Sequence, residues 1–212
     1  CNMTNAGIPD SAMMNDLETV GNAQVSTSVK KFGTGSLSLA TNTGSDYFSE
    51  NQYQTFAFGT GDFTIETWIY PTSTTSYQCL VSVGSGDGTN TGEFSLYSRH
   101  AGANGMIIYY NSGGGNQALY TSNGIVPANN VWSHLAVVRY NGTVTFYLNG
   151  VAGTTGTIAG QLGGASVQTT IGVRTGNTSI TYFPGYLDDF RVSKIARYTA
   201  NFTPPTSAFY TF

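Results

Sequence analysis

Asp188 is the first candidate for a chemical role, because it is an acidic residue on the side of a predicted strand that should be buried. Residues 185–193 have the alternating pattern of a β-strand, with Phe190 and Val192 on one side. Asp188 falls on that same side, which we expect to be buried. Burying an ionised carboxylate is costly unless a cation or several hydrogen bonds meet it. The pattern therefore predicts either a metal ion or a set of backbone N–H donors at Asp188.

The other acids do not form a catalytic pair. A retaining glycosidase needs two carboxylates about 5 Å apart, which alternate positions of one strand can supply. Glu66 and Glu93 each stand alone in their expected strands. Asp188 and Asp189 are adjacent, so their side chains should point to opposite faces, with Asp189 in solvent.

The two histidines give little support for catalysis either. His134 lies in a strand on the same face as Trp132, and we interpret it as a packed or hydrogen-bonded residue. His100 follows Arg99 at the edge of a loop, where we expect it to be exposed. With two histidines and two distant cysteines, the sequence has no zinc-binding pattern and no Cys/His nucleophile.

The composition excludes two classes of partner. Charged residues make up 9% of the 212 residues, well below the roughly 25% of ordinary globular proteins. The net charge of −3 and the scatter of the 8 Lys and Arg residues argue against nucleic acid, which needs clustered basic side chains. No apolar run approaches the roughly 20 residues of a membrane-spanning helix, so no membrane insertion is expected.

The cysteines leave two possibilities open. Cys1 and Cys79 permit either one disulfide or two free thiols. Because the chain begins with Cys1 and not with Met, we expect a processed form or a piece of a larger protein.

Strand patterns run through most of the chain. Residues 62–70 have apolar side chains on both faces of the expected strand, which predicts a central strand that is covered on both sides. Asn141-Gly142 and Asn149-Gly150 follow β-branched and aromatic runs, as hairpin turns do. We expect residues 1–24 to be irregular, residues 56–61 to form an edge strand and residues 153–164 to form a loop. Further strands are predicted at residues 24–31, 36–39, 46–48, 78–83, 93–97, 106–110, 132–140, 144–148, 169–174 and 186–193.

This pattern predicts the fold class. No stretch has a sustained helical period with caps, and about a dozen short strands have the spacing of a sandwich. We therefore expect an all-β protein in which residues 1–212 form one domain.

Four segments in the right order resemble a known family. The sequence is similar to the laminin G-like branch of the concanavalin A-like lectin/glucanase domains, and most of all to copies from phage virion and tail-fibre proteins. The resemblance implies a jelly-roll β-sandwich of two antiparallel sheets. It rests on residues 32–39, 58–71, 132–150 and 185–193, together with Lys194-Ile195-Ala196-Arg197-Tyr198 and Phe202-Thr203-Pro204-Pro205.

The resemblance also implies a structural calcium ion. Many relatives hold one Ca²⁺ near the first loop and the final strand, where Asp10 and Asp188 stand in this sequence. Asp16 and Asn15 could supply further oxygen ligands from the loop. The alternative is that Asp188 accepts only backbone hydrogen bonds.

Tyrosines are the candidate ligand-binding residues. In the implied architecture, Tyr97, Tyr109, Tyr110 and Tyr120 could line the concave sheet or its rim. Tyrosine stacks on sugar rings while its hydroxyl forms hydrogen bonds. Tyr109 and Tyr110 are adjacent, so one should face the core and the other should point outward.

These observations predict a non-catalytic module outside the cell or on a virion surface. The leading hypothesis is adhesion to, or recognition of, cell-surface glycan. The alternative is a decoration or spacer domain that contacts neighbouring virion proteins or further copies of itself, without a small ligand. A polysaccharide hydrolase or lyase is the least favoured reading.

Overall fold

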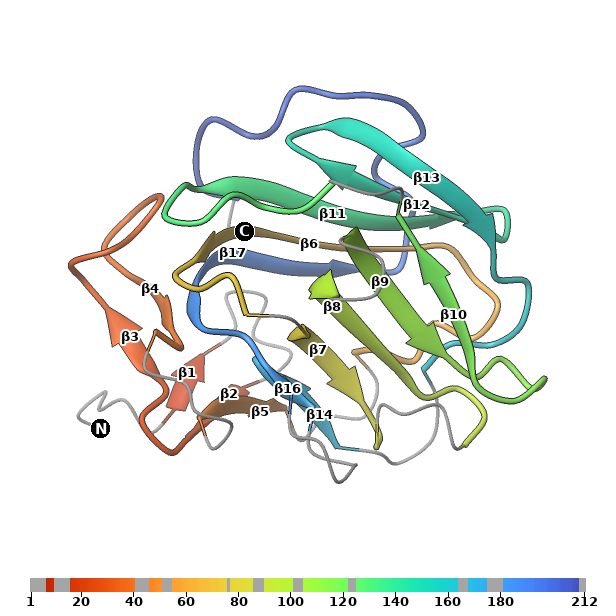
Figure 1. Cartoon of the computed structure of the whole chain (residues 1–212), viewed down its shortest axis with the longest axis horizontal. Coiled ribbons are helices and arrows are strands. Elements are labelled where there is room, and N and C mark those ends of the chain that lie inside the picture. Colours follow the sequence, from red (N-terminus) through yellow and green to blue (C-terminus); the bar gives the residue numbers. More distant parts are fainter. Residues whose placement is uncertain are drawn as a thin grey trace.

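The computed structural model describes residues 7–9, 16–40, 46–50, 55–75, 77–85, 90–100, 105–121, 125–163, 168–174 and 181–209. Within these ranges the regular elements are strands, which form two large antiparallel sheets (Figure 1). The prediction of an all-β sandwich of two antiparallel sheets is confirmed. No helix in the described ranges is long and apolar enough to cross a membrane.

One sheet has eight strands. Its order is β1 (Gly7–Pro9), β2 (Asp16–Val20), β5 (Tyr47–Glu50), β14 (Thr169–Ile171), β7 (Gln78–Val83), β8 (Phe94–His100), β9 (Gly105–Tyr110) and β10 (Gln117–Tyr120).

The other sheet has seven strands, and a short hairpin accompanies the two sheets. The order in the seven-stranded sheet is β13 (Val151–Thr157), β12 (Thr143–Leu148), β11 (Ser133–Tyr140), β6 (Phe63–Pro71), β17 (Gly185–Ser193), β4 (Ser36–Ser38) and β3 (Gln24–Ser26). The hairpin pairs β15 (Val173–Arg174) with β16 (Thr181–Tyr182).

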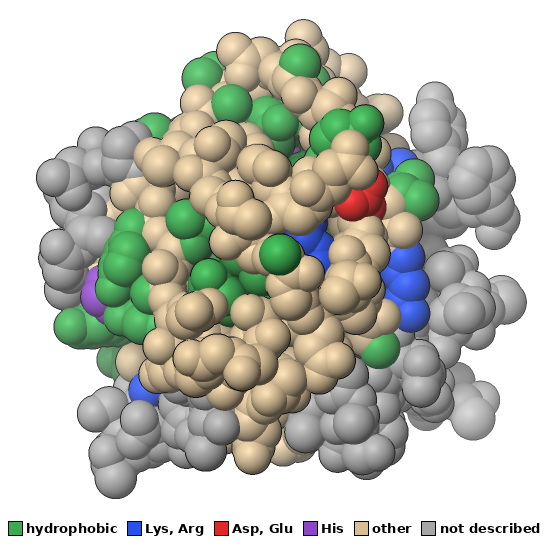
Figure 2. All heavy atoms as spheres, turned by 90° about the vertical axis from the view of Figure 1, so that its right-hand side faces the viewer, with side chains coloured by type: hydrophobic (Ala, Val, Ile, Leu, Met, Phe, Trp, Pro, Cys, Tyr) green, Lys and Arg blue, Asp and Glu red, His purple; other side chains and the backbone are tan. Residues whose placement is uncertain are grey.

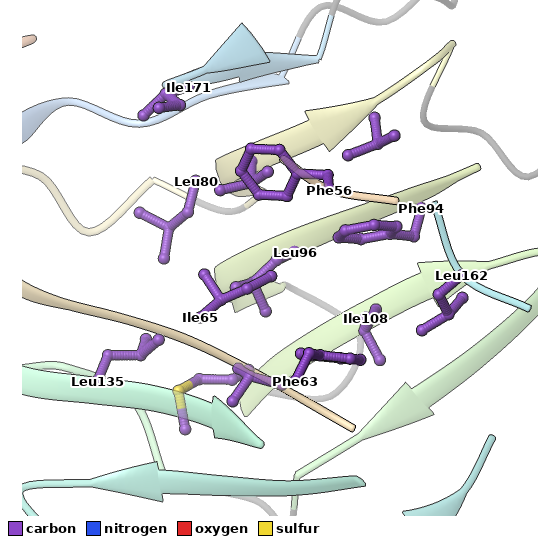
Figure 3. Close-up of a cluster of buried hydrophobic side chains, with 14 of the residues drawn as sticks. Phe56, Phe63, Ile65, Leu80, Phe94, Leu96, Ile108, Leu135, Leu162 and Ile171 are labelled. Carbon is purple, nitrogen blue, oxygen red and sulfur yellow. The ribbon is translucent and has the colours of Figure 1, made fainter. Parts of the chain in front are cut away.

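The main core fills the space between the two sheets. Figure 3 shows side chains from both sheets pointing toward one another, among them Ile65 and Leu135 on one side and Leu80 and Leu96 on the other. These four side chains are almost completely buried. Removing this apolar surface from water is the main stabilising contribution to such a sandwich.

The two Asn-Gly pairs form tight turns, as predicted. Asn141 has φ +48° and Gly142 has φ +77°, and Asn149 and Gly150 repeat this geometry with φ +52° and +77°. Asn and Gly tolerate the left-handed region that a two-residue hairpin turn of this kind needs. The first turn sets the register of β11 and β12, in which Tyr140 is opposite Thr143.

The predicted edge strand at residues 56–61 is wrong. This segment forms turns around the fully buried side chain of Arg139. The guanidinium of Arg139 donates hydrogen bonds to the carbonyls of Gly59 at 2.7 Å, Gly61 at 2.7 Å and Gly160 at 3.1 Å. Gly59 also forms an isolated β-bridge with Leu162, but residues 56–61 do not continue it as a strand.

Other strands were missed in the sequence. Residues 153–164 were predicted to be a loop, but β13 covers Val151–Thr157. β1 and β2 lie in the segment that was predicted to be irregular. β10 was also not predicted. β10 and β13 lie at the ends of their sheets and are largely exposed, so they lack the alternation that marks a half-buried strand.

A β-bulge in β17 changes the face on which Asp188 lies. Leu187 pairs with the core residue Ile69, and Asp188 pairs with Trp68. The register then shifts before Arg191, and Asp189 has a φ of +48°. Asp188 therefore lies on the outer face of the sheet, and our expectation that it shares a face with Phe190 and Val192 is wrong.

The last described residues cross the outer face of the seven-stranded sheet (Figure 1). We call residues 194–209 the C-terminal strap. Its Tyr198 and Phe202 pack on a small cluster formed by Ala136, Val138 and Tyr147 of β11 and β12. The strap thus covers β6 from outside, which confirms that residues 62–70 form a central strand buried on both faces.

Candidate functional site

Three of the four candidate tyrosines point to the same face of the eight-stranded sheet. Ile107 of β9 is opposite Tyr97 of β8 on one side and opposite Tyr120 of β10 on the other. Tyr109 is two residues from Ile107, so its side chain leaves the strand on the same face. Tyr110 points the other way and packs in the core between the sheets.

Two further rings complete this group. His100, at the end of β8, has ring contacts with Tyr109 at 5.5 Å and Tyr120 at 5.8 Å between centroids. Tyr77 contacts His100 at 4.5 Å, and Tyr97 contacts Tyr109 at 5.8 Å. All four contacts are edge-to-face, an arrangement that aromatic pairs favour. We call the set Tyr77, Tyr97, His100, Tyr109 and Tyr120 the tyrosine face.

The tyrosine face has a buried base and an exposed rim. Tyr97 is 1% exposed, whereas Tyr77 and Tyr120 are 43% and 39% exposed. The base is fixed by the β15–β16 hairpin, because the hydroxyl of Thr181 donates to the Tyr97 oxygen at 3.3 Å. Arg174 is opposite Thr181 in this hairpin. Burial raises the pKa of Tyr97, and the charge of Arg174 partly opposes that rise.

His100 was expected to be exposed, and this expectation is wrong. Its side chain is enclosed by the tyrosine rings, and the residue is 6% exposed. Nε2 of His100 lies 2.8 Å from the hydroxyl oxygen of Tyr109, so the two groups share a hydrogen bond. Burial lowers the pKa of His100, which keeps the imidazole neutral at pH 7. The sequence contained no signal for this role, because Tyr77, Tyr109 and Tyr120 come from other segments of the chain.

The tyrosine face can stack on a planar or ring-shaped ligand and form hydrogen bonds with it. Its exposed rings offer apolar faces next to hydroxyl groups. Figure 2 shows one side of the molecule, where few charged side chains reach the surface and hydrophobic side chains gather beside a histidine at the left.

The carboxylate of Asp188 is held by backbone donors. Its Oδ2 accepts the N–H groups of Lys31 at 2.7 Å and Phe32 at 3.0 Å, and its Oδ1 accepts the N–H of Asp189 at 2.9 Å. These bonds are the second of the two arrangements that the sequence predicts. Together they use both lone-pair sites of Oδ2 and one of Oδ1, which leaves about one site, on Oδ1, for a cation.

The other predicted calcium ligands are not described. Asp10 and Asn15 lie outside the described residues, and nothing is established for the side chain of Asp16. Among the side chains that the structure describes, no three His, Cys, Asp or Glu residues are placed to hold a metal ion. The calcium site stays a prediction.

Asp189 is not the exposed bystander that we expected. It is half-buried, and its Oδ2 accepts the N–H of Phe209 in the C-terminal strap at 2.8 Å. Burial raises the pKa of Asp189, and the hydrogen bond from Phe209 partly opposes this.

Glu66 also has partners that the sequence did not reveal. Its Oε1 accepts a hydrogen bond from Nε of Arg191 at 2.8 Å and lies 2.7 Å from Nη2 of the same residue. Its Oε2 accepts the hydroxyl of Tyr198 at 2.8 Å and lies 3.3 Å from Nε2 of His134. Arg197 adds a cation at 3.7 Å. Burial raises the pKa of Glu66, but His134, Arg191 and Tyr198 outweigh burial and hold the pKa below its ordinary value.

The pairing of Glu66 with His134 brings together an acid and a base, but solvent does not reach them. Both side chains are 0% exposed. Tyr198 and Phe202 of the C-terminal strap have ring contacts with His134. Glu93, the other isolated acid, accepts hydrogen bonds from Ser85 and Asn90.

Cys79 is a free thiol on the outer face of the eight-stranded sheet, where it packs with Tyr97. It is fully buried, and burial raises the pKa of the thiol to about 12. Cys1 lies outside the described residues.

A family model described as the concanavalin A-like lectin/glucanases superfamily, of laminin G type, matches residues 42–201. The chain belongs to this family. The matched residues run from just before β5 to within the C-terminal strap, so they include the whole tyrosine face.

Solved structures share the fold of this concanavalin A-like chain. Domain 4 of AbnA, a GH43 extracellular arabinanase from Geobacillus stearothermophilus, in complex with arabinotriose, superposes with a TM-score of 0.64 at 19% identity, covering 83% of this chain and 77% of that one. The Ruminococcus gnavus IT-sialidase CBM40 bound to α2,3-sialyllactose has a TM-score of 0.53 at 21% identity, covering 67% and 80%. No curated protein matches the sequence.

Proposed function

We propose that this chain is a non-catalytic module that recognises glycan on a cell surface through the tyrosine face. The observation that carries the proposal is the gathering of four tyrosines and a histidine on one sheet face, two of them well exposed at its rim. Stacking on aromatic rings and hydrogen bonding to hydroxyls are the two interactions that a sugar ring offers. Carbohydrate complexes of two proteins with the same fold support this choice of ligand.

The conformation of Tyr77 supports a binding role. Tyr77 has a φ of +65°, in the left-handed region that bulky residues rarely adopt. Such strain is tolerated where the surroundings impose it, and it is common at ligand-binding sites. Here it accompanies the closest ring contact of the tyrosine face, that with His100.

The burial of Glu66 and His134 supports a non-catalytic role. A general acid or base must reach the substrate within hydrogen-bonding distance, and these two side chains lie beneath the C-terminal strap. Within the tyrosine face, the titratable groups are tyrosines and one neutral histidine, and none of them is a carboxylate. Glycoside hydrolysis of the usual kind requires two carboxyl groups.

We place the module outside the cell, on a virion or another secreted assembly. A surface with few charges, built from Thr, Ser, Asn and Gly, supports this setting. The sequence resemblance to virion and tail-fibre copies of the family supports the virion in particular.

A glycan array tests the function. We expect the purified chain to retain at least one oligosaccharide from a set that includes arabinotriose and sialyllactose. Tyr120→Ala should weaken that binding about tenfold, because it removes an exposed stacking surface. Tyr120→Phe should keep most of the affinity, since the ring remains.

The matched control is Val151→Ala, which shortens an exposed apolar side chain on β13 of the other sheet. It should bind like the unmodified chain. If the unmodified chain retained no glycan, the recognition function would be wrong and the spacer function would stand. If it bound glycan but Tyr120→Ala bound equally well, the tyrosine face would be the wrong site.

A further inference from the structure

A groove lies on the opposite side of the sandwich from the tyrosine face. It has a volume of about 350 Å³ and runs between the β11–β12 hairpin and the C-terminal strap, on the outer face of the seven-stranded sheet. We call it the strap groove. Its principal lining residues are Tyr140, Asn141, Thr143, Thr145, Tyr147 and Tyr198.

Strand register explains why these side chains meet. Tyr140 is opposite Thr143, and Val138 is opposite Thr145, so each pair lies side by side on one face of the hairpin. Val138 belongs to the cluster on which the strap packs, which identifies this face as the outer one. The hairpin therefore forms the floor and one end of the strap groove, and the strap forms a wall.

The wall of the groove is rigidly held. The hydroxyl of Tyr198 donates to the buried carboxylate of Glu66 at 2.8 Å. The ring of Tyr198 stacks on Phe202, with 3.6 Å between centroids and 6° between planes. An aromatic ring that is fixed before the ligand arrives loses little conformational entropy on binding.

The chemistry of the lining favours an uncharged ligand with many hydroxyl groups. The eight lining residues supply aromatic rings, hydroxyls and one amide, and none of them carries a charge at neutral pH. The carboxylate of Asp62, which accepts the N–H of Asn141 at 2.9 Å, lies at the hairpin end and would repel an anion. The volume is near the lower end of the roughly 300–1,000 Å³ of small-molecule sites, so the ligand is short.

We propose that the strap groove is a second saccharide-binding site, which takes a neutral mono- or disaccharide. This site is separate from the tyrosine face, because the two lie on the outer faces of different sheets. A module with two sites on opposite sides can bind two chains of a polysaccharide, or gain avidity on a dense glycan surface.

Amide NMR of the ¹⁵N-labelled chain tests this proposal. The probes are galactose, lactose, maltose and cellobiose at millimolar concentration. At least one of them should shift the amides of Thr143, Thr145 and Thr199. The shifts should persist in Tyr120→Ala, which weakens binding at the tyrosine face only and so separates the two proposals.

The disabling variant is Tyr140→Ala combined with Thr145→Val. Tyr140 is 48% exposed at the end of the hairpin, so the change removes a stacking surface with little effect on the fold, and the spectrum reports that fold directly. We expect at least tenfold weaker binding at the groove, while Val151→Ala keeps it. Shifts absent from the groove with all four sugars, or unchanged in the double variant, would overturn the proposal, whatever the outcome at the tyrosine face.

Discussion

Glu66 is ionised although it is completely buried. A carboxylate removed from water needs partners for both oxygens, and Arg191, His134 and Tyr198 supply them. Two of these three partners come from β17 and the C-terminal strap, far from Glu66 in the sequence. Glu66 therefore anchors the end of the chain to the middle of the seven-stranded sheet.

This burial predicts that Glu66→Gln destabilises the protein by roughly 3 kcal/mol, because it removes the buried anion that the partly exposed guanidinium groups of Arg191 and Arg197 meet. The pKa of Glu66 is lowered from its ordinary value of 4.5 in the folded state. Its contribution is thus fully present above that ordinary value and is lost as the pH falls through the folded-state pKa. Thermal unfolding between pH 7 and pH 3 measures both effects.

The control for this prediction is Glu18→Gln, which changes an exposed carboxylate on β2. It should leave the melting temperature at pH 7 almost unchanged. The Glu66→Gln variant should lose part of the pH dependence of the unmodified protein. If the melting temperatures of Glu66→Gln and of the unmodified protein fell equally between pH 7 and pH 3, Glu66 would not contribute to the acid sensitivity.

Such partners could not be found from the sequence. Along its own strand Glu66 has no neighbouring acid, whereas Arg191 is its Cα partner in the neighbouring strand β17. That pairing depends on the bulge after Asp188, which leaves no mark in the alternation of residue types. The same limit applies to His100, which contacts Tyr97 of its own strand but also rings from β9, β10 and the residue before β7.

At the scale of elements, the C-terminal strap contacts both the central strand β6 and the β12–β13 turn. It has no strand of its own, yet the N–H of Phe202 donates to the carbonyl of Gly150 at 2.9 Å, and Thr64 bonds to both Ile195 and Arg197. The strap covers β6 and forms a wall of the strap groove. Its close approach to the β12–β13 turn requires glycine at position 150.

Gly150→Ala should therefore destabilise the strap in particular. A Cβ at this position would collide with the carbonyl of Phe202, in addition to the strain of a φ of +77°. Gly142→Ala is a matched control, since it has the same φ of +77° but its nearest neighbour would be 3.9 Å away. We expect about 1 kcal/mol of destabilisation for Gly142→Ala and clearly more for Gly150→Ala.

Limited trypsin digestion shows where the difference lies. In Gly150→Ala we expect faster cleavage after Lys194 and Arg197, which are in the strap. In Gly142→Ala the rate should stay near that of the unmodified protein. Equal rates in the two variants would mean that the strap does not depend on its contact with this turn.

The elements that the sequence predicted correctly are those whose conformation is determined by their own residue types. The Asn-Gly turns are tied to positive φ values, and the central strands β6 and β11 are rich in β-branched and aromatic residues. β13 consists mostly of Gly, Thr and Ala and was missed, because its strand conformation depends on pairing with β12. Its own residues favour neither burial nor alternation.

At the scale of the whole molecule, the N-terminal strands and the closing strand belong to different sheets. β1 and β2 lie in the eight-stranded sheet, whereas β17 lies near the middle of the seven-stranded sheet. A calcium ion bound by Asp10, Asp16 and Asp188 would therefore have ligands from segments of both sheets, with Asp188 on the outer face of its own sheet. The backbone donors from Lys31, Phe32 and Asp189 explain the buried carboxylate of Asp188 without a metal, so the two explanations need a measurement that separates them.

We propose that calcium is bound there, and EDTA provides that measurement. A ligand present at about 100 times its Kd stabilises a protein by about 2.7 kcal/mol, which is roughly 5–10 °C for a chain of this size. EDTA should lower the melting temperature by this order. Asp188→Ala should melt lower than the unmodified chain because it also loses the backbone hydrogen bonds, but EDTA should no longer change its melting temperature.

Asp46→Ala is the matched control, because Asp46 is 3% exposed and also accepts a backbone N–H, from Asn22 at 2.7 Å. This variant should lose stability and still respond to EDTA. Calcium binding at Asp188 is thus measured by the change in melting temperature on adding EDTA, and not by the melting temperature itself. A melting temperature of the unmodified chain that is identical in calcium and in EDTA would leave Asp188 as an acceptor of backbone hydrogen bonds alone.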